Sequence, residues 1–246
     1  MSEANEKTLS SGFAGGKRID FLDLWRSVCV WMMLLYHAAY DLMLFGILPA
    51  AIESHPLARV YTSLCSGGFI LLSGFCIRMS RNPYRRGAIV FLSALLVSAG
   101  SALAGLPIRF GVLHLLGICM FLYALLRRWI ERLPADRRLI AVCLCLFAAA
   151  YALIPGVRVE ARWLFPLGLR YDGFYSSDYY PLLPWALLFL TGTLLGRLYE
   201  SAPQDFDYAA LRRNYPAALT FCGRHSLLIY LVHQPVLYGV TWLLFH

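Results

Sequence analysis

The first apolar run of the sequence carries a cation, an imidazole and a carboxylate where such groups are costly. Arg26 and His37 are separated by ten residues in the segment DLWRSVCVWMMLLYHAAYDL, and Asp41 follows His37 by four residues. In an α-helix, the step from Arg26 to His37 covers about three turns and rises about 16 Å, so the three side chains share one face at different depths. Ionisable groups inside a membrane helix more often line a reaction path than face lipid. We therefore expect this helix to line such a path.

A second histidine lies near the start of a later apolar run. In the segment IRFGVLHLLG, Arg109 precedes the run and His114 lies five residues further on, about 7.5 Å along a helix. With a cytoplasmic N-terminus, His114 descends from the outer side while His37 rises from the inner side. Both are then predicted to reach the outer half of one central cavity. For His114 alone, a purely structural hydrogen bond between helices is an equal alternative.

An acidic residue precedes the sixth apolar run, in the segment SSDYYPLLPWALLFLTGTLLGR. Asp178 is placed at the outer mouth of the bundle, where it is predicted to pair with Arg109 or to contact an acceptor together with Tyr179. The two prolines of the segment favour a helix start and a kink. The alternatives are that Asp178 only solvates a loop, and that the aromatic outer segment around it is an interfacial belt.

The last apolar run has polar groups at its start and in its interior, in the segment FCGRHSLLIYLVHQPVL. Ser226 is a suitable helix N-cap, and Arg224 is available to an anion at that positive helix end. His233 and Gln234 lie about 10 Å further along, which is costly unless polar partners or cavity water meet them. They are candidate substrate-binding residues, with a proline-kinked helix that satisfies its own backbone as the alternative.

The composition requires a membrane to surround these segments. The chain of 246 residues is 59% hydrophobic and 15% charged, and its mean hydropathy is +0.60, too apolar for a soluble domain. Solid apolar runs indicate α-helices rather than a barrel, so we predict an all-α helical bundle with seven transmembrane helices. The predicted spans are Val28–Leu48, Val60–Ile77, Ala88–Leu106, Phe110–Leu126, Leu139–Ile154, Pro181–Leu198 and Ser226–Phe245. The fifth is the shortest, and a different helix count would begin there.

Loop charges predict the orientation. With a cytoplasmic N-terminus, seventeen of the twenty-two Lys and Arg residues fall on the inner side. The formal net charge of +8 is then explained by topology and anionic lipid, and it does not indicate nucleic-acid binding. We expect a disordered cytoplasmic tail over residues 1–20 and a single transmembrane domain over 21–246. We expect no signal peptide, because about twenty mostly polar residues precede the first apolar run and that run is long enough to span a membrane.

The small and sulfur-containing residues are interpreted as packing residues. The seven cysteines fall mostly within spans and lack metal-ligand spacing, so we expect neither a disulfide framework nor a metal site. The segment CSGGFILLSG contains Gly67, Gly68 and Gly74, which are predicted to allow close helix packing rather than to bind phosphate.

Together these segments resemble the bacterial relatives of the heparan-α-glucosaminide N-acetyltransferase catalytic domain, and more loosely the acyltransferase type 3 family. The matching pieces are RIDFLDLWRSVCVWMMLLYHAAYDL, GGFILLSGFCIRMSR, IRFGVLHLLG, DYYPLLPW and GRHSLLIYLVHQPVL, which cover most of the chain in order. The spacing of Arg26 and His37 is similar to a motif that both families place in their first helix.

The resemblance implies a multi-pass enzyme of the bacterial cytoplasmic membrane that moves an acetyl group from cytoplasmic acetyl-CoA to an amine or hydroxyl of a sugar or glycan acceptor outside. Arg26 and Arg224 are then expected to hold CoA phosphates. His37 would act as general base or carry the acetyl group, Asp41 would orient its ring, and His114 is a second catalytic candidate. Acetyl-CoA, the acceptor and the bilayer are the expected partners, with a homodimer left open.

In the lysosomal enzymes of the family the catalytic histidine follows the first helix, and another polar residue occupies the position of His37. His55 in the outer loop is a candidate counterpart, ranked behind His37 and His114. Two other functions are alternatives. One is a proton-coupled permease in which Arg26, His37, Asp41 and His114 form a relay and gate. The other is a structural subunit of a surface-polysaccharide export complex, which would not need His37.

Overall fold

The structure is a computed structural model that describes residues 19–134, 136–201 and 213–245. Seven helices in this part of the chain are long and apolar enough to cross a membrane. They are α2 (Asp20–Leu44), α4 (Pro56–Ile77), α5 (Pro83–Leu103), α6 (Val112–Ile130), α7 (Arg137–Leu153) with its extension η1 (Ile154–Gly156), α8 (Leu182–Ser201) and α11 (Ser226–Phe245). The predicted all-α class and the count of seven spans are confirmed.

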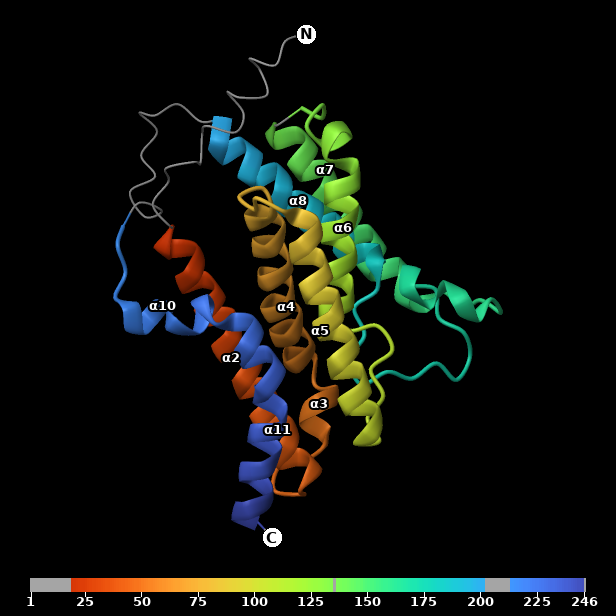
Figure 1. The fold of residues 1–246 in the computed structure, drawn as a ribbon. Helices are drawn as coiled ribbons and strands as arrows, with labels where there is room; N and C mark the ends of the chain where they lie inside the picture. The colour runs from red at the N-terminus through yellow and green to blue at the C-terminus, as the bar shows by residue number, and fades with distance from the viewer. Residues whose placement is uncertain (1–18, 135, 202–212, 246) are drawn as a thin grey trace.

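The long helices form two groups with α4 on the border between them (Figure 1). The larger group contains α4 to α8, with its main packing between α4 and α8, α5 and α6, and α7 and α8. In the smaller group, α2 packs against α11 and against the short helix α10 (Ala217–Arg224). The helix α3 (Ala51–Ser54) leads into α4, and α2 meets α4 where Cys65 Sγ donates to the carbonyl oxygen of Cys29. The two groups leave room between them for a site.

Glycines permit the closest approach within the larger group. A Cβ atom at Gly74 of α4 would collide with the backbone of Phe189 in α8, and one at Gly192 of α8 would collide with the backbone of Leu71. The two helices therefore pack backbone to backbone, as small residues allow in membrane bundles. Gly67 and Gly68 also face neighbouring side chains, so the predicted packing role of the three glycines in the CSGG segment is confirmed.

An ion-pair network joins the helix ends of the larger group on the side of the α4–α5 connection. Arg78 Nη1 lies 2.7 Å from Glu131 Oε1, and the same guanidinium pairs with Glu200. Arg197 donates to backbone carbonyls at the end of α6, including that of Leu133. These arginines hold the ends of α4, α6 and α8 together.

Several predicted boundaries differ from the structure. The first span begins at Asp20 rather than Val28, which places Arg26 inside the helix, and it ends at Leu44. Only Ile19 and Asp20 of the predicted tail lie within the described residues. The fifth span, predicted as the shortest, reaches twenty residues because α7 continues into η1.

All seven cysteines are free thiols, and five of them are buried.

Candidate functional site

A cavity of about 1450 Å³ lies between the two helix groups. Its lining runs from Cys29 to Leu44 on α2 and from Ser226 to Tyr238 on α11, about 20 Å along each helix. The opposite walls come from α4, α5, the start of α8 and the connection before it. The volume exceeds that of usual small-molecule sites, so it has room for an extended ligand or two ligands side by side.

His37 on α2 and His233 on α11 both line this cavity and contact each other. Their ring centroids are 4.7 Å apart with the rings edge to face, and the His37 ring has a similar contact with Tyr36 at 5.6 Å. The sequence predicted both histidines as site residues but did not predict that they meet. The structure therefore joins a candidate base to a candidate substrate-binding residue.

A backbone hydrogen bond determines which nitrogen of His233 carries the proton in the neutral ring. Nδ1 lies 2.7 Å from the carbonyl oxygen of Tyr230, so Nδ1–H is the donor. Nε2 is then an acceptor, and it is buried without a hydrogen-bond partner among the described residues. His233 is 7% exposed. The ring is thus held with its basic nitrogen buried and unpaired.

Asp41 does not bond to His37. It is 0% exposed, and its Oδ1 accepts a hydrogen bond from Gln234 Nε2 at 2.8 Å. Among the described residues, no hydrogen bond or ion pair joins its carboxyl group to the His37 ring, and Asp41 is not part of the cavity lining. The predicted orienting contact from Asp41 to His37 is therefore replaced by a contact to α11, because the carboxyl group turns toward the helix packed against it.

Arg26 and Arg224 come together at the start of α2, away from the cavity lining. Arg26 Nη1 lies 2.7 Å from Asp23 Oδ1, and Arg224 pairs with Asp20 at 3.1 Å and with Asp23 at 3.6 Å. The backbone N–H of Gly223 donates to Ser27 Oγ at 2.7 Å, which fixes α10 against α2. Two arginines that the sequence separates by almost the whole chain thus share one carboxylate, and their side chains remain partly exposed.

His114 and Arg109 lie apart from His37. His114 Nδ1 accepts from the backbone N–H of Gly111 at 3.2 Å, and the ring stacks on Phe110. This caps the start of α6. His114 is 7% exposed and is not among the residues lining the large cavity, so the geometry gives no support to its predicted catalytic role. Arg109 is exposed and donates to Tyr171 Oη at 3.2 Å.

Asp178 and Tyr179 line the cavity at the end remote from Asp23, but both are also bonded within the protein. Asp178 Oδ2 accepts from the backbone N–H of Val112 at 3.1 Å, rather than from Arg109 as predicted. Burial raises the pKa of Asp178 to about 6, against the lowering effect of that hydrogen bond. Tyr179 Oη donates to the carbonyl oxygen of Phe165, and burial raises its pKa to about 12.

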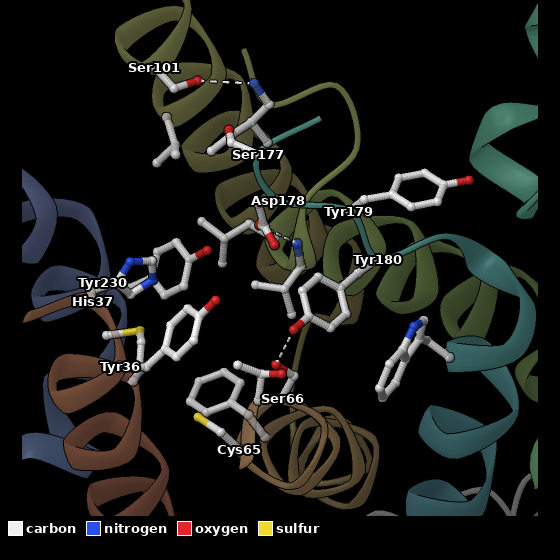
Figure 2. Close-up of a pocket in the computed structure, with 18 of the residues that line it drawn as sticks. Tyr36, His37, Cys65, Ser66, Ser101, Ser177, Asp178, Tyr179, Tyr180 and Tyr230 are labelled. Carbon is white, nitrogen blue, oxygen red and sulfur yellow. Dashed lines mark hydrogen bonds between the residues drawn. The ribbon is translucent and has the colours of Figure 1, made fainter. Parts of the chain in front are cut away.

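Hydroxyl groups that the sequence analysis missed surround the centre of the cavity. The hydroxyls of Tyr36, Tyr180 and Tyr230 point toward one space beside His37 and Asp178, and Tyr180 and Ser66 are hydrogen-bonded at 2.6 Å (Figure 2). Burial, as the largest cause, raises the pKa of Tyr180, so the hydroxyl stays neutral. Tyr36 adjoins His37 and Tyr230 precedes His233 by one turn, a spacing that could have identified both.

The arrangement can bind a polar molecule and remove a proton from it. His37 supplies a basic ring at the cavity wall, and the hydroxyls and Asp178 supply hydrogen-bond partners. Among the described residues, no group of three or more His, Cys, Asp or Glu side chains is arranged to hold a metal ion.

Comparison with known proteins identifies one match. The model of the family described as heparan-alpha-glucosaminide N-acetyltransferase, catalytic, matches residues 18–235. No curated protein and no solved structure matches the chain. The matched range includes the predicted site residues from Arg26 to Gln234.

Proposed function

The chain belongs to the heparan-alpha-glucosaminide N-acetyltransferase catalytic family of membrane acetyltransferases, and from this premise we propose that it moves an acetyl group from cytoplasmic acetyl-CoA to an amine or hydroxyl of a sugar-type acceptor. The protein is a multi-pass membrane protein. The observation that carries the proposal is the position of His37 in the wall of the large cavity, beside His233 and a ring of hydroxyls. His37, a candidate base, therefore borders a space in which hydroxyl groups can bind a polar acceptor.

His37 is proposed as the general base. Its free ring nitrogen takes the proton of the acceptor amine or hydroxyl while that nitrogen or oxygen attacks the thioester carbonyl carbon. The new carbon–nitrogen or carbon–oxygen bond forms, the carbon–sulfur bond breaks, and the imidazolium returns the proton to the departing CoA sulfur. His233 is proposed to support the His37 ring, which it contacts with ring centroids 4.7 Å apart, while its own Nε2 is buried in the protein.

The donor is proposed to enter from the end of α2 where Arg26 and Arg224 lie. Arg26 precedes His37 by eleven positions, about 16 Å along the helix, a distance that an extended pantetheine arm covers. CoA phosphates would compete with Asp20 and Asp23 for the two guanidinium groups, which bind phosphate well. The excess of Lys and Arg residues in the loops at this end supports its placement in the cytoplasm.

The acceptor is proposed to occupy the end of the cavity near Asp178. Neutral hydroxyls of Tyr36, Tyr180 and Tyr230 suit the alternating donors and acceptors of a sugar. Arg170 and Arg59 also line the cavity and could meet an acidic substituent.

The test measures free CoA thiol released from acetyl-CoA by the purified protein, with and without a mixture of amino sugars. We expect His37→Gln to lower turnover by at least about 100-fold, because glutamine cannot accept the proton. His55→Asn is the matched control. His55 Nδ1 accepts from the backbone N–H of Leu57, and asparagine can keep that helix cap while removing the imidazole. This control should keep wild-type turnover.

The outcomes separate the competing functions. Acceptor flux into vesicles without thiol release would indicate a permease and contradict the transferase. An unchanged rate in His37→Gln with loss in His55→Asn would move the base to the outer loop.

A further inference from the structure

Asp41 and Gln234 form a buried polar pair between α2 and α11, behind the two histidines of the cavity. Gln234 Nε2 donates to Asp41 Oδ1 at 2.8 Å. The other carboxyl oxygen, Asp41 Oδ2, and the amide oxygen, Gln234 Oε1, are both buried without a hydrogen-bond partner among the described residues. The carboxyl group of Asp41 and the amide group of Gln234 therefore each have one oxygen without a hydrogen bond.

One proton on the carboxyl group would satisfy both atoms. An ionised carboxylate only accepts hydrogen bonds, and so does an amide oxygen. With an ionised Asp41, Oδ2 and Gln234 Oε1 therefore could not form a hydrogen bond with each other. A neutral carboxylic acid donates from Oδ2, and the amide oxygen of the same partner is an acceptor. A carboxyl and a primary amide then make two parallel hydrogen bonds. Buried polar atoms are nearly always paired, and an uncompensated buried charge is far more costly.

The surroundings of Asp41 offer no cation in the described part of the chain. No Lys or Arg side chain forms an ion pair with it there, and it accepts no second donor. Within one turn of Asp41 and of Gln234 along their own helices, the titratable side chains are Tyr40 and His37 on α2, and Tyr230, His233 and Tyr238 on α11. Of these, His233 has its Nδ1–H bonded to Tyr230 instead.

We propose that Asp41 is a neutral carboxylic acid which forms a double hydrogen bond with Gln234, and that this clamp holds His37 against His233. Asp41 follows His37 by one turn of α2, and Gln234 directly follows His233 on α11. The hydrogen bond between Asp41 and Gln234 therefore determines how His37 and His233 meet, with their ring centroids 4.7 Å apart. Asp41 is then a positioning residue, and only its effect on turnover rests on the proposed function.

The variant that isolates the clamp is Asp41→Asn. Its side-chain amide can donate to Gln234 Oε1 and accept from Gln234 Nε2, so the neutral double hydrogen bond is kept without a titratable group. Asp41→Ala removes both bonds. We expect Asp41→Asn to keep turnover within about threefold of wild type, and Asp41→Ala to lose more than about tenfold. The pH–rate profile of Asp41→Asn should keep the wild-type midpoint, because no negative charge near His37 has been lost.

The protonation state itself is measured by infrared spectroscopy of the intact protein, independently of turnover. The difference between wild type and Asp41→Asn should contain the carbonyl stretch of one neutral carboxylic acid. That band should persist from about pH 6 to about pH 8, where an Asp with the ordinary pKa of about 3.9 is ionised.

Two results would overturn the clamp. One is a missing carboxylic-acid band. The other is an Asp41→Asn protein that is inactive, or active with a shifted pH midpoint, since a neutral double hydrogen bond that asparagine reproduces predicts neither. By contrast, a present band together with full turnover in His37→Gln would leave the clamp in place and reject the proposed base.

Discussion

At the scale of single residues, buried carboxyl groups are the features of this protein that depend most on their surroundings. Asp178 and Asp41 both lack a cationic partner in the described residues, and each accepts one hydrogen bond from an N–H group. Asp23, by contrast, is 1% exposed and pairs with two arginines. The same side-chain type thus serves as a helix cap, a clamp between helices, and the centre of an ion-pair cluster.

Asp178 should make stability depend on pH. Burial raises its pKa to about 6, above its ordinary value of about 3.9. Because the folded state holds the proton more tightly, this group's stabilising effect is complete below its ordinary pKa and is lost as the pH rises through about 6. The raised pKa corresponds to about 3 kcal/mol, and water in the adjoining cavity should reduce the effect to about 1–2 kcal/mol.

The matched variant for this prediction is Asp178→Asn, which can still accept from the N–H of Val112 but cannot ionise. We expect thermal melts of the detergent-solubilised protein to show wild type losing stability relative to Asp178→Asn between about pH 4 and pH 7. A constant difference between the two proteins across this range would show that Asp178 titrates normally.

At the scale of elements, the close crossing of α4 and α8 is the feature that gives the larger helix group its rigidity. Gly74 and Gly192 face the backbone of the partner helix with no space for a methyl group. The connection before α8 supplies Tyr180 and Asp178 to the cavity and the first turn of α8 supplies Trp185, so the position of α8 also sets one wall of the site.

A methyl group at the crossing should separate the two helices. We expect Gly192→Ala to cost about 2 kcal/mol or more, because the backbone of Leu71 cannot move aside as a side-chain tip could. Gly239→Ala in α11 is the control, since a Cβ there meets no atom within 4 Å and alanine favours helix. The measurement is the midpoint of thermal unfolding in detergent. Equal midpoints for the two variants would contradict backbone contact at this crossing.

At the scale of the whole molecule, the two helix groups meet around a cavity, and the predicted donor and acceptor residues lie toward opposite ends of α2. Arg26 and Arg224 pair with Asp20 and Asp23 at the start of α2. Asp178 lies near Tyr36 and His37, in the second half of that helix (Figure 2). Transfer between compartments needs such a separation, together with an orientation that puts the Arg26 end in the cytoplasm.

Orientation can be tested with single surface cysteines. In a protein whose exposed Cys145 is replaced by serine, Arg81→Cys and Glu160→Cys place thiols in connections at opposite ends of the bundle. We expect a membrane-impermeant maleimide to label Glu160→Cys in intact spheroplasts, and Arg81→Cys only in inverted vesicles, as the distribution of basic residues predicts. The reverse pattern would place the arginine cluster outside and exclude cytoplasmic CoA as its ligand.

The sequence by itself determined the class of the protein, because length and hydropathy limit what can cross a bilayer. It determined seven helical spans, the packing role of the glycines near Gly74, and the family, since these depend on local composition and on motifs. It also indicated His37, His233 and Gln234 as costly polar groups that need partners.

Only the tertiary structure decided which partners those groups have. Periodicity places Asp41 on the same face as His37, but the packing of α11 against α2 turns its carboxyl group to Gln234. The spacing of His114 equally suited a catalytic or a structural role, and the fold of the chain before α6 made it a cap. Contacts between residues almost two hundred positions apart depend on how whole helices pack, and one helix's sequence does not contain its neighbour's position.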